Sequence, residues 1–170
     1  FGYSLPHAAG KPGLVAMRSN LWISRSSIFG GLGQKGRWCN LCPAAGGDGG
    51  QGIVLTDCTL TVYASRVEGA NGGPPGCDPQ TNWCAVTGNG GDGIHLTDSS
   101  LTVMGIQPRA GLRGGPNGVD GHPILRAGSS PVRTVSNARP PVLRILGAAA
   151  RGAQIRIRLD TQPHNTGVLI

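Results

Sequence analysis

The sequence has few aromatic residues, few acidic residues and no long apolar run. Aromatic residues make up 4% of the chain, so any hydrophobic core must be built mainly from Val, Ile and Leu. No stretch approaches the about 18 apolar residues of a membrane span, which predicts that the chain does not cross a membrane. No window shows helical apolar spacing free of Gly and Pro, so long helices are not expected.

Glycine, in contrast, is abundant, with 30 residues. It does not recur at every third position as in collagen, so we expect it to serve turns and loops. The five Cys residues in a short, Gly-rich chain favour an oxidising, extracellular compartment. The chain starts at Phe1 rather than Met, which suggests a processed product or part of a longer polypeptide.

The strongest signal is an internal repeat. Residues 13–23, 52–62 and 93–103 superpose without a gap, about 40 residues apart, which is a spacing typical of stacked repeats. Each segment alternates apolar and polar residues around a polar corner, and a Gly-rich loop follows it. Stacking would place Leu21, Leu60 and Leu101 in one hydrophobic column, and residues 121–125 look like the start of a fourth unit.

The pattern Gly-Ile-x-Leu-x-Asp-Ser-x-Leu-x-Val with long Gly-rich loops resembles the right-handed parallel β-helices of secreted bacterial proteins, both pectate-lyase-like enzymes and autotransporter passengers. The resemblance covers residues 13–125. It implies an all-β fold, namely a right-handed parallel β-helix of three to four coils in residues 1–128. That fold hosts lyases, hydrolases, adhesins and structural stalks, so the resemblance does not choose an activity.

The end of the chain differs in composition. Residues 129–141 are rich in Ser, Pro and Arg and are predicted to be a linker. Residues 142–146, 153–159 and 167–170 are predicted strands of a small antiparallel β tail spanning 142–170, which resembles part of a β-sandwich. Residues 126–170 hold seven Arg and one acid, so the net charge of +7 is concentrated there, with Arg144, Arg156 and Arg158 on the tail.

Four cysteines lie in two equivalent loops, Cys39 with Cys42 and Cys77 with Cys84. A disulfide in each loop is the favoured interpretation, and a zinc site made by all four is the alternative. The fifth, Cys58, aligns with Ser19 and Ser99 and is predicted to be a free, buried thiol.

Two loop ends, residues 46–50 and 88–94, resemble the calcium-binding Gly/Asp nonapeptide of β-rolls. Calcium would then bind through Asp48, Asp92 and Asp120. The other interpretation is that Gly and Asp supply turns with positive φ. No other cofactor is expected.

Three further residues share one column of the repeat, namely Arg18, Asp57 and Asp98. They could form a ladder of interacting charges, although capping of corner amides is the simpler role. The three tryptophans, Trp22, Trp38 and Trp83, are candidates for stacking on sugar rings. No catalytic residue stands out, so an enzyme is not favoured.

The first functional hypothesis is an extracellular structural or surface protein. It would be a module of a stalk, filament or adhesin that self-associates through its ends or its tail sheet. The alternative is a module that binds or cleaves an acidic polysaccharide. Nucleic acid is not an expected partner, because the Arg residues are not interleaved with aromatic residues.

Overall fold

A computed structural model describes residues 8–39, 42–81, 83–135, 142–146 and 156–160. Within these ranges every regular element is a β-strand and none is a helix. The strands are β1 (Leu14–Met17), β2 (Asn20–Ser24), β3 (Ser27–Phe29), β4 (Trp38–Cys39), β5 (Cys42–Pro43), β6 (Ile53–Thr56), β7 (Thr59–Tyr63), β8 (Arg66–Glu68), β9 (Ile94–Thr97), β10 (Ser100–Met104), β11 (Ile124–Ala127), β12 (Val132–Val135), β13 (Val142–Leu146) and β14 (Arg156–Asp160).

Three parallel sheets contain most of these strands. Their orders are β1-β6-β9-β11, β12-β10-β7-β2 and β3-β8. Strands about 40 residues apart pair without a register shift, so Leu60 pairs with Leu21 on one side and with Leu101 on the other. The predicted leucine column is therefore confirmed. We call the four aligned strand runs layers 1 to 4 (residues 14–29, 53–68, 94–104 and 124–135).

The layers turn at two corners, where one residue has a left-handed backbone. The first corner has Arg18, Asp57, Asp98 and Gly128, and the second has Arg25, Ala64 and Gly105, with φ between 43° and 63°. A left-handed conformation costs a non-glycine residue about 1–2 kcal/mol, so the stacking of the layers must maintain it. These corners end each strand after three to five residues.

The core lies between the inward faces of the parallel sheets. Ile53, Leu55, Leu60, Val62, Ile94 and Leu96 are fully buried, and they all belong to layers 2 and 3. The aligned residues of layers 1 and 4, such as Leu21 and Ile124, are only partly buried. Among the described residues, the central layers thus have a layer on both sides, whereas the end layers have one on a single side.

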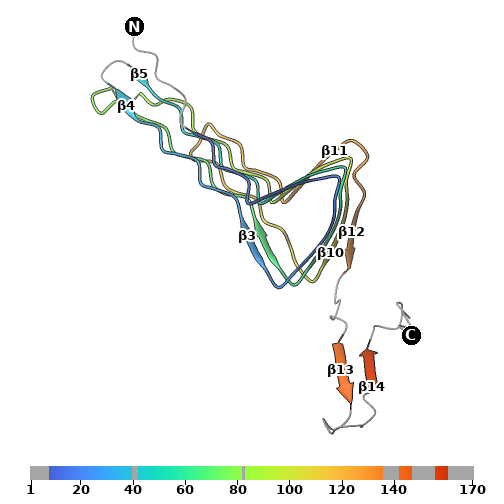
Figure 1. The fold of residues 1–170 in the computed structure, drawn as a ribbon. Coiled ribbons are helices and arrows are strands. Elements are labelled where there is room, and N and C mark those ends of the chain that lie inside the picture. The colour runs from blue at the N-terminus through green and yellow to red at the C-terminus, as the bar shows by residue number, and fades with distance from the viewer. Residues whose placement is uncertain (1–7, 40–41, 82, 136–141, 147–155, 161–170) are drawn as a thin grey trace.

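The Gly-rich segments form a second kind of structure, which we call the arms (residues 30–39 with 42–52, 69–81 with 83–93, and 110–121). Figure 1 shows them as zigzag traces running side by side away from the layers. Their backbone hydrogen bonds advance by three residues on both partners, which is the period of a polyproline II helix. One such series joins Gly46, Gly49 and Gly52 to the carbonyl oxygens of Val86, Asn89 and Asp92.

The glycines of the arms have a role that was not expected from the sequence, namely close contact between neighbouring backbones. The positive-φ glycines of the described ranges are Gly105 and Gly128, which lie at corners and not in the arms. A Cβ atom at Gly88 would lie 2.6 Å from the carbonyl carbon of Gly47, and one at Gly91 would lie 2.5 Å from that of Gly50. Arm glycines are therefore required because neighbouring backbones touch, and within the arms they do recur every third residue. The arms are the Gly-rich loops expected from the sequence, and what the sequence did not show is that they pack backbone against backbone.

The predicted fold class is also wrong in its architecture. The chain is all-β, but its strands form separate parallel sheets of two to four strands rather than a single β-helix closed by an antiparallel tail. The physical reason is that left-handed corners and arms without strand geometry interrupt the strands, although hydrogen bonds between layers continue through both. The third sheet has two strands, and a single parallel bridge from Glu68 to Arg109 continues its pairing.

The end of the chain differs from its prediction in two respects. The tail has two antiparallel strands in the described residues, β13 and β14, and the third predicted strand at 167–170 lies outside them. Part of the predicted linker is strand β12, which pairs in parallel with β10. Val132 of β12 packs inward against the core, and this apolar contact explains the strand.

Candidate functional site

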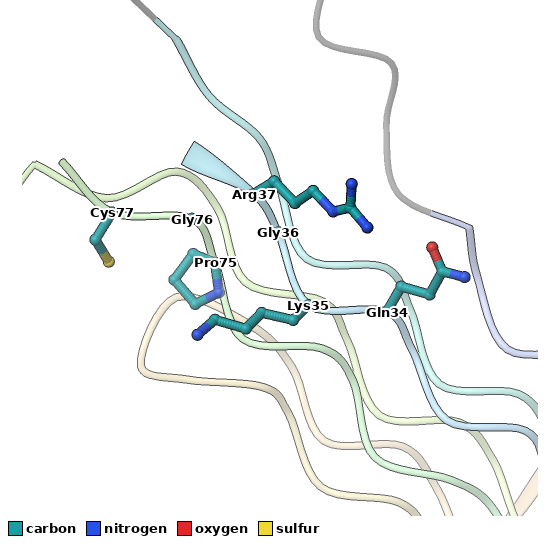
Figure 2. Close-up of a pocket in the computed structure, with 7 residues that line it drawn as sticks. All are labelled: Gln34, Lys35, Gly36, Arg37, Pro75, Gly76 and Cys77. Atoms are coloured by element: carbon teal, nitrogen blue, oxygen red, sulfur yellow. The ribbon is translucent and has the colours of Figure 1, made fainter. Parts of the chain in front are cut away.

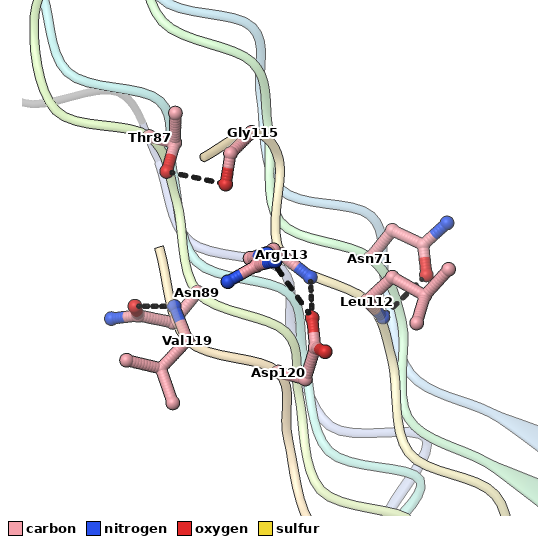
Figure 3. Close-up of polar contacts among 8 residues, drawn as sticks. All are labelled: Asn71, Thr87, Asn89, Leu112, Arg113, Gly115, Val119 and Asp120. Carbon is pink, nitrogen blue, oxygen red and sulfur yellow. Dashed lines mark hydrogen bonds and ion pairs between the residues drawn. The ribbon is translucent and has the colours of Figure 1, made fainter. Parts of the chain in front are cut away.

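Asn and Asp side chains on the arms bind the backbone of the next layer's arm. The Oδ1 atom of Asn71 accepts a hydrogen bond from the N–H of Leu112 at 2.8 Å, and that of Asn89 accepts one from Val119 at 2.9 Å (Figure 3). Asp48 accepts one from the N–H of Asn89 at 2.7 Å. Among the described residues no backbone carbonyl accepts from these three amides, so the side chains satisfy them.

The three calcium candidates are engaged in the same way. Besides Asp48, Asp92 accepts from the N–H of His122 at 2.9 Å, and Asp120 accepts from the N–H of Arg113 at 2.9 Å. In the described part of the chain, no three His, Cys, Asp or Glu side chains are grouped to hold a metal ion. Calcium binding at these residues stays a prediction. Their visible role is to accept backbone hydrogen bonds, from another layer for Asp48 and Asp92 and from the same arm for Asp120.

Asp92 also lies between two imidazoles, which sequence reasoning did not bring together. Its Oδ1 is 3.3 Å from Nδ1 of His122, and its Oδ2 is 3.3 Å from Nδ1 of His95. The side chain of Asp92 is 12% exposed. This cluster joins the arm of layer 2 to the start of layers 3 and 4.

The column of Arg18, Asp57 and Asp98 occupies the first corner, as the alignment indicated. Asp98 accepts a hydrogen bond from the N–H of Ser129 at 2.9 Å, so capping of a corner amide is observed for this residue. The described residues show no ion pair between Arg18 and Asp57. A Cβ atom at Gly128 would collide with the Asp98 carboxylate, which explains why the column ends in glycine.

The cysteines have three different environments. Cys77 and Cys84 form a disulfide, which confirms one predicted bridge and rules out a zinc site that uses all four loop cysteines. Cys39 and Cys42 face each other in register across β4 and β5, but their side chains lie outside the described part. Cys58 is free and buried, as predicted.

Cys58 belongs to a ladder of small polar side chains behind the first corner. The N–H of Ser19 donates to its sulfur at 3.4 Å, and its own N–H donates to Oγ of Ser99 at 3.0 Å. The N–H of Ser99 in turn donates to Oγ of Ser130. The thiol thus replaces a serine hydroxyl in a chain of hydrogen bonds between layers.

A basic hollow of about 770 Å³ lies near the end of the arms. It is lined by Gln34, Lys35, Gly36, Arg37, Pro75, Gly76 and Cys77. Figure 2 shows Lys35 extending beneath Pro75, whereas Arg37 and Gln34 point to the other side. Its two charged side chains are both cations, so this lining would attract an anionic group.

A second hollow, of about 610 Å³, borders an arginine–glutamate cluster beside β8. Arg66 donates two hydrogen bonds to the carboxylate of Glu68, at 2.8 and 2.9 Å, and its guanidinium lies 5.1 Å from the ring centre of Phe29. These hydrogen bonds lower the pKa of Glu68 and raise that of Arg66. Arg109 adds a weaker contact, 3.7 Å from Glu68. The Arg-x-Glu spacing on one strand face is the sequence signal that could have located this pair.

The tryptophans are not gathered in one place. Trp22 lies on the outer face of β2 and is 61% exposed. Trp83 is 63% exposed in the loop closed by the Cys77–Cys84 disulfide. The side chain of Trp38 lies outside the described part.

The tail arginines can be placed only by strand register. Arg144 pairs with Arg158, and Arg156 pairs with Leu146, across β13 and β14. Their side chains lie outside the described part.

Comparison with protein-family models, curated proteins and solved structures finds no match to this chain. The family resemblance drawn from the sequence therefore stays a prediction. Among the described residues, there is no helix of the length and apolarity that crossing a bilayer requires.

Proposed function

We propose that this chain is a structural module of an extracellular or cell-surface protein, such as a stalk, filament or adhesin, and that it assembles end to end with copies of itself. The observation that carries the proposal is the partly exposed core at layers 1 and 4. Leu21, Ile23 and Ile28 are partly buried, whereas the aligned Leu60, Val62 and Val67 are at most 1% exposed. A further layer would bury the same apolar columns.

The sheet edges support the same assembly. Strands β1 and β11 are the edges of one sheet, and β2 and β12 are the edges of another. An unpaired edge presents backbone donors and acceptors to another strand. Since β11 and β1 belong to one in-register series, the last layer of one copy can pair in parallel with the first layer of the next. Such head-to-tail contacts do not close, so they produce filaments.

The disulfide is compatible with an extracellular location, because such bonds persist mainly in oxidising compartments. Glycine-dependent backbone packing is consistent with a structural role as well. It gives the arms hydrogen-bonded order without a large hydrophobic core.

The test is self-association measured by light scattering over a concentration series, with a variant that blocks one edge. The N–H groups of Leu14 and Arg18 bind layer 2, so the N–H of Val15 points to the free edge of β1. Val15 is 58% exposed, and Val15→Pro removes this donor without removing a bond to β6. Val15→Thr is the matched control, because it keeps the N–H.

We expect the mass of the wild-type chain to grow with concentration, and Val15→Pro to weaken the association at least about tenfold, or about 1.4 kcal/mol. Val15→Thr should assemble like the wild type. A wild-type chain that remains monomeric throughout the series would overturn the proposal. Equal assembly by both variants would show that the β1 edge is not the contact.

A further inference from the structure

One row of side chains crosses the outward face of the second sheet from its first strand to its last. It runs through Trp22, Thr61, Thr102 and Arg133, which pair in register on β2, β7, β10 and β12. Trp22 is 61% exposed, and Arg133 is exposed as well. In the described part of the chain, no cation lies over the Trp22 ring and Arg133 forms no ion pair. The row therefore has an aromatic ring at one end and a cation at the other.

The column at the first corner has opposite charges at its two ends. Its members in layers 1 to 4 are Arg18, Asp57, Asp98 and Gly128. Asp98 belongs to layer 3, but its Oδ1 accepts a hydrogen bond from the N–H of Ser129 and lies where a Cβ atom of Gly128 would be. Layer 4 thus presents an exposed carboxylate in place of its missing side chain. The residues that the structure describes give neither Arg18 nor Asp98 an ion pair.

End-to-end assembly would bring these end groups together at the contact between layer 4 of one copy and layer 1 of the next, which we call the joint. In the register of the stack, Trp22 of the next copy follows Arg133 at the strand spacing of about 4.8 Å. A guanidinium at that distance can stack on the indole, the ring that attracts cations most strongly. Arg18 of the next copy follows Gly128 in the same way and therefore faces the Asp98 carboxylate.

The charges of the end layers favour this direction of assembly. Layers 1 and 4 contain no acidic residue, and their charged side chains are Arg18, Arg25, Arg126 and Arg133. Two layer 1 ends placed face to face would oppose cations with no acid in either layer to offset them. A head-to-tail joint instead adds the carboxylate of Asp98. Opposite charges across an interface favour the right partner end, and like charges disfavour the wrong one.

We propose that two pairs of side chains, Trp22 with Arg133 and Arg18 with Asp98, connect neighbouring copies at the joint and fix its head-to-tail direction. The inference rests on the proposed end-to-end assembly and adds the groups that recognise the partner end. Each pair joins layer 1 of one copy to the layer 4 end of another, so both pairs form in the same orientation.

The test is the dissociation constant of self-association of the whole chain, measured by sedimentation and light scattering. Asp98→Asn removes the charge but keeps an acceptor for the N–H of Ser129, and asparagine tolerates the left-handed corner. We expect it to weaken association about three- to tenfold. Asp57→Asn is the matched control, because it makes the same change in the same column away from the joint. It should associate at least as strongly as the wild type, since Arg18 then loses a neighbouring carboxylate within its own chain.

The aromatic pair has its own variants. Trp22→Ala should weaken association about three- to tenfold, because it removes the ring that faces Arg133. Trp83→Ala removes an equally exposed indole outside layers 1 and 4, so it should associate like the wild type.

Exchange of the charges tests the direction of the joint. Arg18→Asp and Asp98→Arg should each weaken association at least about tenfold, because each places like charges at the joint. An equimolar mixture of the two variants should associate like the wild type, since every joint between unlike copies again has opposite charges. Arginine already occupies left-handed corners at Arg18 and Arg25, and thermal unfolding checks that each variant keeps its fold. A role confined to the fold of each chain would not give this recovery.

The possible failures of the two proposals are distinguishable. If the wild type associates and Val15→Pro weakens it, but Asp98→Asn and Trp22→Ala do not, this inference is wrong and the end-to-end proposal stands. An equal loss in Asp98→Asn and Asp57→Asn, or a mixture of the exchanged variants that stays dissociated, would also overturn it. A wild-type chain that stays monomeric would overturn both proposals.

Discussion

Replacing Gly73 by alanine tests whether backbone contact explains the glycine content of the arms. The added Cβ atom would lie 2.5 Å from the carbonyl carbon of Gln34, and closer still to its oxygen. Carbon atoms in ordinary contact are about 3.5–4.0 Å apart, so the two arm segments would have to separate by about 1 Å.

That separation would lengthen or break the backbone hydrogen bonds that Gly73 makes. The N–H of Gly73 donates to Gly47 at 2.8 Å, and its carbonyl accepts from Gly88 at 2.9 Å. Each bond contributes about 0.5–1.5 kcal/mol, and a buried group left unpaired costs about 1–3 kcal/mol. Alanine restricts the unfolded chain relative to glycine, which offsets about 0.5–1 kcal/mol. The net loss of unfolding free energy should be about 2–4 kcal/mol.

The assay is thermal unfolding by calorimetry, combined with amide hydrogen exchange. A loss of this size lowers the Tm of a chain of this length by about 5–15 °C. Exchange should accelerate most at Gly73 and Gly88. Gly31→Ala is the control, because its Cβ atom would come no closer than 3.0 Å to Lys11 at the outermost layer. If both variants unfold within about 1 °C of each other, backbone contact is not the reason for these glycines.

Two further predictions concern the corner and the ion pair. Ala64→Gly should stabilise the chain by about 1 kcal/mol, and Gly105→Ala should destabilise it by a similar amount, because both positions are left-handed, with φ of 43° and 63°. Urea denaturation measures both variants, and changes of the same sign in the two would contradict the argument. For Glu68, the lowered folded-state pKa means that its stabilisation is present above the unfolded-state pKa and is lost as the pH falls through the folded value. The difference in unfolding free energy between wild type and Glu68→Gln should therefore shrink from about pH 7 towards about pH 3, and a difference that stays constant would refute it.

Several structural features could be predicted from the sequence because they depend on the repeat of about 40 residues, which stacks as layers. The spacing of the repeat predicts that Leu21, Leu60 and Leu101 pair in register, and strands that pair in this way are parallel. Cys58 could be placed because it aligns with serines, and its place between Ser19 and Ser99 confirms the prediction. The Cys77–Cys84 bridge is short-range, so local spacing was sufficient.

The sequence alone determined the all-β composition, the register of the layers and the buried apolar columns, since these depend on periodicity that neighbouring residues already show. Only the tertiary structure decided what the glycines and the Asp and Asn residues of the arms do. Gly73 is required by Gln34, and Asn89 binds Val119, so each role depends on a backbone that lies about 30 to 40 residues away. The division into separate sheets has the same origin, because corners and arms end the strands only once distant segments are packed against one another.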